Sequence, residues 1–165
     1  MGKPLEGKRA LVTGGSRGIG AAIALRLARD GAHVALTYVS KPDQAAGTAK
    51  AARAFGVKSI AIEADSADAA AVVAAVERAA AEWGGLDILV NNAGVAAMAP
   101  IDEFPLEDLD RTLAVNLRAV FVATQAAVKH MQKGGRIITI GSFFVDADYR
   151  LKATPGNGMD AHHHH

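Results

Sequence analysis

Cysteine is absent from the 165 residues, which excludes disulfide bonds and thiolate chemistry. The chain also lacks a charge surplus: 18 Lys and Arg stand against 17 Asp and Glu, without the basic excess typical of nucleic-acid binding. No apolar run reaches the roughly 20 residues that a membrane-spanning helix needs. The first residues are not typical of a signal peptide. We therefore expect a cytoplasmic protein that binds neither nucleic acid nor a membrane.

Histidine is scarce outside the end of the chain. Four of the six histidines, His162–His165, form a consecutive run that we interpret as a purification tag. His33 and His130 each stand alone, so the sequence predicts no metal site. We expect one domain at residues 1–142, an atypical tail at 143–161 and the tag at 162–165.

The richest motif is a strand, a glycine turn and a helix in succession. A short apolar run at residues 10–12 precedes Gly14, Gly18 and Gly20, and an apolar helix pattern follows at 21–28. In dinucleotide-binding folds the first glycine allows a sharp turn, the second admits a pyrophosphate, and the third lets the helix pack closely on the strand. The motif therefore predicts a dinucleotide site, with an ordinary tight turn between strand and helix as the alternative.

The rest of the chain alternates between short apolar segments and helix patterns, which predicts an α/β fold with a parallel sheet. Right-handed crossovers give a Rossmann-type doubly wound sheet in the order 3-2-1-4-5, with the ligand crevice between strands one and four. The expected strands are Arg9–Thr13, His33–Tyr38, Lys58–Ile62, Asp87–Val90 and Arg136–Ile140. The expected helices are Gly18–Asp30, Pro42–Phe55, Ser66–Trp83 and Pro105–Gln132, with Ser66 as the cap of the third.

Polar residues follow two of these strands. Asn91, Asn92, Ala93 and Gly94 come after strand four, beside the predicted glycine turn, where asparagines can bridge backbones and face a ligand. The alternative is a pair of ordinary turn-forming asparagines. The dipeptide 65–66 follows strand three and is suited either to an adenine edge or to capping the next helix.

Taken together, the motifs resemble the short-chain dehydrogenase/reductase family, with most similarity to its 3-oxoacyl-carrier-protein reductase-like branch. The resemblance covers about Leu5 to Ser142 and rests on Thr13-Gly14-x-x-x-Gly18-x-Gly20, Asn91-Asn92-Ala93-Gly94, Asn116 and Ser142. It implies that the cofactor phosphates and ribose are held by Gly14, Ser16, Arg17, Gly18, Ile19 and Gly20. Asp65 and Ser66 would then meet the adenine, Asn91 to Gly94 would line the ribose side, and Asn116 and Ser142 would belong to the catalytic tetrad.

The end of strand two predicts which cofactor is bound. An NAD site places a carboxylate there for the ribose 2′-hydroxyl, but no acid appears in this region before Asp43. Ser40 and Lys41 stand there instead, and Arg17 and Lys41 are suited to a 2′-phosphate. We therefore expect NADP(H) rather than NAD(H).

The resemblance implies hydride transfer between NADPH and a carbonyl or alcohol substrate, with a Tyr-x-x-x-Lys motif supplying the proton. That motif does not occur in the 165 residues, and Tyr149 and Lys152 lie three apart with no helix pattern around them. We interpret the chain as the cofactor-binding half of such an enzyme with a foreign tail, so turnover should be impaired. The alternative is a non-catalytic, engineered or truncated Rossmann module that folds and self-associates.

The tail carries a pattern of its own. Apolar and polar residues alternate without a break from Val145 to Thr154, which predicts a half-buried strand within residues 143–153. A turn at Gly141-Ser142 would fold this strand back antiparallel on strand five. Alternatively, two copies would pair antiparallel about Tyr149, with opposite charges facing each other. Because the edge of strand five would otherwise be exposed, we expect a homodimer or larger homo-oligomer.

Overall fold

The computed structural model of the chain describes residues 2–141 and 145–148. Several predicted features lie outside these residues: Ser142, the Tyr149 and Lys152 pair, and the remainder of the tail. The predicted turn at Gly141-Ser142 lies half outside them, with only Gly141 described.

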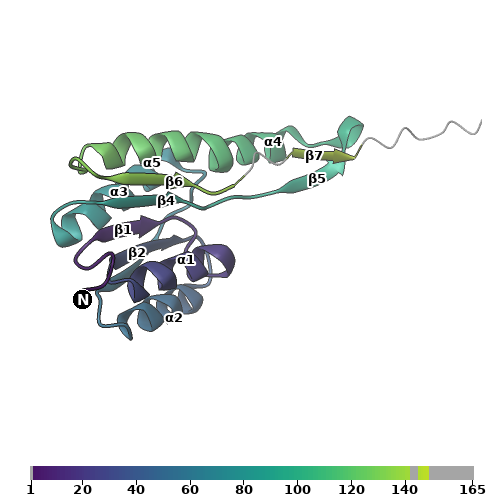
Figure 1. The fold of residues 1–165 in the computed structure, drawn as a ribbon. Helices are drawn as coiled ribbons and strands as arrows, with labels where there is room; N and C mark the ends of the chain where they lie inside the picture. Colours follow the sequence, from purple (N-terminus) through teal and green to yellow (C-terminus); the bar gives the residue numbers. More distant parts are fainter. Residues whose placement is uncertain (1, 142–144, 149–165) are drawn as a thin grey trace, which may run out of the picture.

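A five-stranded parallel sheet forms the centre of the fold (Figure 1). Its order is β3-β2-β1-β4-β6, which confirms the predicted order 3-2-1-4-5, because β6 is the predicted fifth strand. Neighbouring strands pair residue by residue, with Leu11 of β1 beside Ala35 of β2 and Leu89 of β4. The strands are β1 Arg9–Val12, β2 His33–Tyr38, β3 Ser59–Glu63, β4 Ile88–Asn91 and β6 Arg136–Thr139.

Helices cover both faces of the sheet, as buried parallel strands require. Along β1 the side chains alternate: Ala10 and Val12 pack in one apolar cluster, whereas Leu11 packs in the other. The first cluster lies under α1, Gly18–Arg29, and α2, Pro42–Arg53. The second lies under α3, Ala69–Trp83, and α5, Ala119–Val128, on the opposite face.

The predicted cap of the third helix is wrong by two residues. Ser66 does not cap α3; the cap is Asp68, whose carboxylate accepts hydrogen bonds from the backbone N–H groups of Ala70 and Ala71 at 3.0 and 3.3 Å. Both residue types are good caps. The carboxylate of Asp65 accepts from the backbone N–H of Ala67 at 2.9 Å, and this local turn places Ser66 before the helix begins.

The predicted long helix at Pro105–Gln132 is one helical run with an irregular turn inside it. α4, Leu106–Leu113, continues into a π-helical turn, η2, Ala114–Arg118, and then into α5. The run ends before Gln132, because the backbone N–H groups of His130 and Met131 bond three residues back, to Ala127 and Val128. Such tightening is common in the last turn of a helix.

A second, two-stranded sheet was not predicted in this form. β5, Ala97–Pro100, and β7, Val145–Asp148, pair in parallel and extend beyond the main sheet (Figure 1). β5 is followed by a short 3-10 helix, η1, at Ile101–Glu103. The predicted antiparallel pairing of the tail strand with strand five is therefore wrong, although β7 lies where a strand was expected.

The parallel pairing has a geometric reason. β4 and β6 are parallel neighbours, so the chains that leave their carboxyl ends run in the same direction. Asn91 pairs with Thr139 and Ala97 with Val145, an offset of 48 residues in both sheets. The second sheet thus continues the register of the first across a gap in the pairing.

The two isolated histidines have local partners on the protein surface. His33 Nδ1 accepts the backbone N–H of Lys58 at 3.0 Å, and its ring lies 5.6 Å from that of Trp83. His130 Nε2 lies 2.7 Å from a carboxylate oxygen of Glu77. Of the helices in the part of the chain that the structure describes, none has the length and hydropathy needed to cross a membrane.

Candidate functional site

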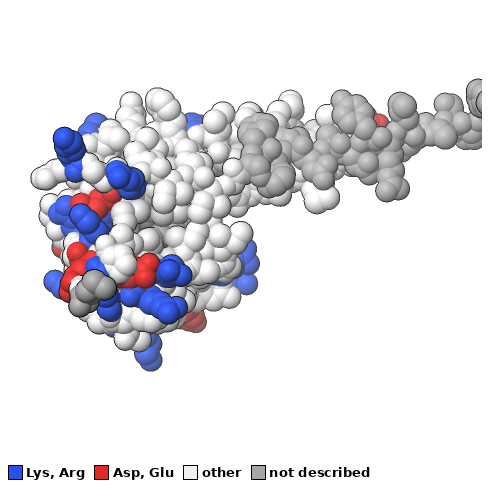
Figure 2. All heavy atoms as spheres, in the orientation of Figure 1, with Lys and Arg blue, Asp and Glu red and all other residues white. Residues whose placement is uncertain are grey.

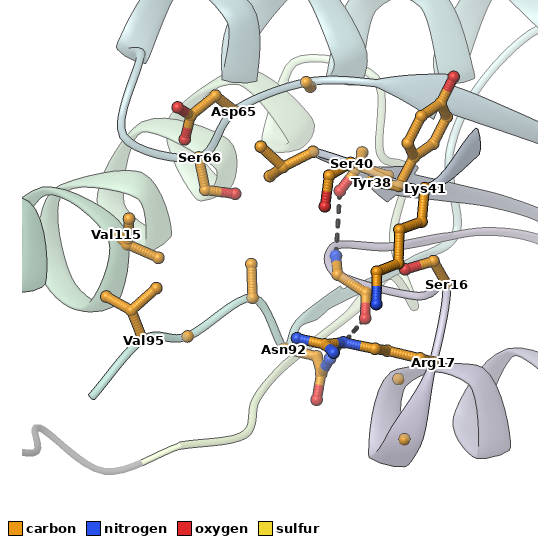
Figure 3. Close-up of a pocket in the computed structure, with 18 of the residues that line it drawn as sticks. Ser16, Arg17, Tyr38, Ser40, Lys41, Asp65, Ser66, Asn92, Val95 and Val115 are labelled. Carbon is orange, nitrogen blue, oxygen red and sulfur yellow. Dashed lines mark hydrogen bonds between the residues drawn. The ribbon is translucent and has the colours of Figure 1, made fainter. Parts of the chain in front are cut away.

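A cavity of about 670 Å³ opens at the carboxyl ends of the strands, where the sheet order reverses between β1 and β4. This volume lies within the range of small-molecule and cofactor sites, and the position is where doubly wound sheets bind ligands. Figure 3 shows side chains from several elements converging on it. Among the predicted cofactor residues, those that line it are Gly14, Ser16, Arg17, Gly18, Ile19, Gly20, Ser40, Lys41, Asp65, Ser66, Asn92, Ala93 and Gly94.

Hydrogen bonds from the neighbouring strand end hold the glycine turn in place. Thr37, in β2, receives two of them: the Gly14 N–H donates to its hydroxyl oxygen and the Gly15 N–H to its carbonyl, both at 3.0 Å. From the other side, the Asn92 side-chain amide donates to the carbonyl oxygens of Thr13 and Gly14 at 3.2 and 3.1 Å. The turn is therefore fixed by both strands that flank β1.

Two of the glycines meet requirements that other residues would not. Gly14 has a φ of +64°, in the left-handed region that favours glycine. At Gly20 a Cβ atom would lie 2.1 Å from the Gly14 carbonyl oxygen and 2.5 Å from the Asn92 amide nitrogen. The first turn of α1 therefore approaches the glycine turn more closely than a side chain permits.

The Asn91–Gly94 segment divides into two parts with different surroundings. The Thr13 hydroxyl oxygen accepts the N–H groups of Asn92 and Ala93, both at 3.0 Å, so this backbone lies against the end of β1. Asn91 is not brought to the cavity: it is buried in β4, and its amide donates to the Thr124 hydroxyl at 3.4 Å. The asparagines thus bridge elements, and only Asn92 also lines the cavity.

Asn116 lies in the π-helical turn and is paired to the loop after Gly94. Its side-chain oxygen accepts the Val95 N–H at 2.9 Å, and its amide donates to the Val95 carbonyl at 2.7 Å. π-helical turns occur often at functional sites. Asn116 therefore holds the backbone of Val95, and Val95 forms part of the cavity wall.

Two cationic side chains, Arg17 and Lys41, point into the same end of the cavity (Figure 3). Among the described residues neither forms an ion pair. Lys41 has a φ of +59°, an uncommon conformation for a residue other than glycine, and such conformations gather at functional sites. The end of β2 brings Tyr38, Val39 and Ser40 to the cavity but no carboxylate.

Asp65 and Ser66 also line the cavity, and Figure 3 shows them across from Arg17 and Lys41. An Asp65 carboxylate oxygen lies 3.5 Å from a guanidinium nitrogen of Arg111, which reaches across from α4. A second arginine, Arg118, donates to the Ala67 carbonyl at 2.7 Å. Two arginines therefore fasten the segment after β3 to the helical run that carries Asn116.

The amino end of α1 is suited to an anion. Arg17 precedes the helix in an extended conformation, no side chain caps the first turn, and that turn contains no acidic residue. The first N–H groups of a helix have no partner within it, and they carry a partial positive charge. A phosphate group at Gly18–Gly20 would accept hydrogen bonds from them.

Sequence reasoning missed several residues of the cavity wall. Thr37 and Tyr38 could have been found, because they end a predicted strand beside the glycine turn. Val95 could have been found as well, because it directly follows the predicted Gly94. Arg111 gave no such signal, since it lies far along the chain from Asp65, which it meets. Only the path of the long helical run brings Arg111 to the cavity.

Known proteins resemble this chain in sequence. A family model described as short chain dehydrogenase matches residues 8–152. An uncharacterized oxidoreductase of Methylorubrum extorquens is 48% identical over 142 residues, which is 86% of this chain and 57% of that protein. The chain spans about half the length of the curated relatives it matches.

Solved structures share the fold at high identity. A short chain dehydrogenase from Burkholderia cenocepacia, in complex with NADP, has a TM-score of 0.82 and 58% identity, covering 84% of this chain and 56% of that one. A blue fluorescent protein from a metagenomic library, in complex with NADPH, has a TM-score of 0.81 and 54% identity, covering 84% and 57%. Both solved proteins contain the phosphorylated form of the cofactor.

Proposed function

Because this chain belongs to the short-chain dehydrogenase/reductase family, we propose that its cavity binds NADP(H). The whole protein would transfer hydride between NADPH and a small carbonyl or alcohol substrate. The observation that carries the proposal is a pair of cations, Arg17 and Lys41, that form no ion pair within the part of the chain that the structure describes. Both point into one end of a cavity whose β2 side lacks a carboxylate. Two similar solved structures, in complex with NADP and NADPH, support the same choice.

The residues around the cavity fit such a cofactor in three parts. The diphosphate would lie at Gly18–Gly20, where the first N–H groups of α1 have no side-chain cap. Arg17 and Lys41 would hold the 2′-phosphate through charge-assisted hydrogen bonds. Asp65 and Ser66 would contact the adenine, and Asn92 to Gly94 would line the ribose side.

The chemistry also requires a proton donor and a group that polarises the substrate oxygen. The bound nicotinamide supplies or accepts the hydride, and the protein supplies the rest. Asn116 would hold the wall beside the reacting atoms, and Ser142 would bond the substrate oxygen. The tyrosine and lysine that complete the family's tetrad have no Tyr-x-x-x-Lys counterpart in the 165 residues. We therefore expect this chain to bind cofactor and to turn over poorly.

A second candidate is a cofactor-binding module without catalysis. The observation that favours it is the missing Tyr-x-x-x-Lys motif. Steady-state NADPH oxidation with a panel of ketones separates the two candidates. Turnover that disappears in Tyr149→Phe would show that this chain is catalytic, whereas binding without turnover supports the module.

The binding proposal is tested by calorimetric titration with NADPH and NADH. The chain should bind NADPH at least tenfold more tightly, and Arg17→Ala should remove most of that preference, because each charge-assisted bond to a phosphate is worth about 1.5–3 kcal/mol. Arg29→Ala is the matched control, since it removes the same charge from the far end of the same helix. Equal or tighter binding of NADH would contradict the proposal.

A further inference from the structure

A hydrogen bond joins α2 to the glycine turn at Ser16, a residue that lines the cavity. The Thr48 hydroxyl, on α2, lies 2.9 Å from the carbonyl oxygen of Ser16. It also lies 3.2 Å from the Gln44 carbonyl of its own helix. A hydroxyl has one proton to donate, and the shorter contact is the one between elements.

This bond connects the two segments that carry the cavity's cations. Ser16 directly precedes Arg17, and Lys41 caps α2 about two helical turns before Thr48. The bonds that Gly14 and Gly15 donate to Thr37 fix the turn only at these two residues, before Arg17 is reached. The Thr48 bond is therefore placed to set the position of the backbone at Arg17 relative to α2.

We propose that Thr48 is a positioning residue for cofactor selectivity: it holds Arg17 and Lys41 at a distance from each other at which both can bind one 2′-phosphate. The inference rests on the proposed NADP(H) function. Two exposed cations on separate elements repel each other, and their long side chains lose entropy when they are fixed on one ligand. The bond between Thr48 and Ser16 restricts the movement of α2 relative to the glycine turn. It therefore lowers the part of the entropy cost that comes from this movement.

The proposal differs from simple packing of α2 in what it predicts. A bond that only stabilised the turn would support NADPH and NADH alike, because both carry the diphosphate that the turn would hold. A bond that positions the two cations acts on the 2′-phosphate, which only NADPH has. The deciding quantity is therefore the ratio of the two dissociation constants.

The test compares Thr48→Val with Thr48→Ser by calorimetric titration with NADPH and NADH. Thr48→Val keeps the shape but removes the hydroxyl, and the preference for NADPH should fall about three- to tenfold, as expected for one hydrogen bond. Thr48→Ser keeps the hydroxyl and should retain the preference of the parent chain. A thermal melt of each variant shows that it is folded, and Thr48→Ala replaces Thr48→Val if the valine variant does not fold.

A second arm places Thr48→Val in the Arg17→Ala background. If Thr48 acts through the cation pair, its effect on the preference should shrink there, because coupled residues are not additive. An unchanged ratio in Thr48→Val, with the parent chain still selective, would overturn this inference alone. A parent chain that binds both cofactors equally would overturn the proposed function, and this inference with it.

Discussion

Gly20 and Gly47 both lie within helices, but an added methyl group would meet opposite surroundings at the two positions. At Gly20 it would lie 2.1 Å from the backbone oxygen of Gly14, which cannot move without disturbing the glycine turn. At Gly47, in α2, nothing lies within 4 Å. The pair therefore separates a glycine that the site requires from one that only costs helix stability.

We predict that Gly20→Ala lowers the free energy of unfolding by about 1–3 kcal/mol through overpacking, and lowers the affinity for NADPH at least tenfold. Gly47→Ala should raise the free energy of unfolding by about 0.5–1 kcal/mol, because alanine is the better helix former, and leave the affinity unchanged. Urea unfolding and calorimetric titration measure the two effects. A Gly20→Ala variant with the parent's affinity would contradict the close approach of α1 to the turn.

At the residue scale the sequence predicted those site residues that belong to a continuous motif. Gly14, the segment Ser16 to Gly20, and Asn92 to Gly94 line the cavity because their strand ends adjoin in a parallel sheet. Asn91 was predicted with them, but the alternation of side chains along β4 turns it toward α5. The contacts of Thr48 and Arg111 join segments far apart in the chain, and no spacing of residues in the sequence predicts them.

Among contacts between elements, the Arg9–Asp87 pair joins the amino ends of β1 and β4. Asp87 accepts the guanidinium Nε–H and the backbone N–H of Arg9, both at 2.9 Å. The side-chain hydrogen bond from Arg9 is the largest cause that holds the pKa of Asp87 below its ordinary value. The pair is only about a quarter exposed, so solvent screens it less than a surface pair.

A lowered pKa in the folded state means that the ionised carboxylate stabilises the fold above the ordinary pKa of about 4, and that this contribution is lost as the pH falls below it. Asp87→Asn should therefore lower the free energy of unfolding by about 1–3 kcal/mol at pH 7, and the difference from the parent should shrink below pH ~4. Urea unfolding at several pH values measures this. Asp110→Asn on the exposed surface of α4 is the control, and a difference independent of pH would contradict the role of the ion pair.

At the element scale the sequence predicted the five sheet strands and the helices between them, because apolar runs and helix periodicity are strong local signals. The prediction from sequence failed where two neighbouring residues were equally good helix caps. Ser66 and Asp68 are both good caps, and the turn at Asp65 decided between them. β5 is four residues long and contains Pro100, so no strand pattern predicted it.

For the molecule as a whole, the feature most open to test is the edge of the main sheet. β6 ends the sheet order, and all four of its residues are exposed, with Ile137 at 39% and Ile138 at 47%. Phe121, on the neighbouring α5, is 66% exposed. Figure 2 shows charged side chains gathered at the left and lower parts of the face, whereas the middle of the face is white.

An exposed apolar edge strand is a template for pairing with another chain. We therefore expect the protein to self-associate through β6, as a dimer or a larger assembly. Ile138→Lys, which places a charge on this edge, should shift sedimentation toward the monomer in analytical ultracentrifugation. Val73→Lys, on the outer side of α3, is the control for an added charge. A parent chain that sediments as a monomer at every concentration would contradict the expectation.

The central claim, that the cavity binds NADP(H), is tested most directly by a crystal structure of the protein grown with NADPH. The account predicts the diphosphate at the amino end of α1, the 2′-phosphate between Arg17 and Lys41, and the adenine beside Asp65 and Ser66. A cofactor bound elsewhere, or one whose 2′-phosphate lies away from both cations, would contradict it.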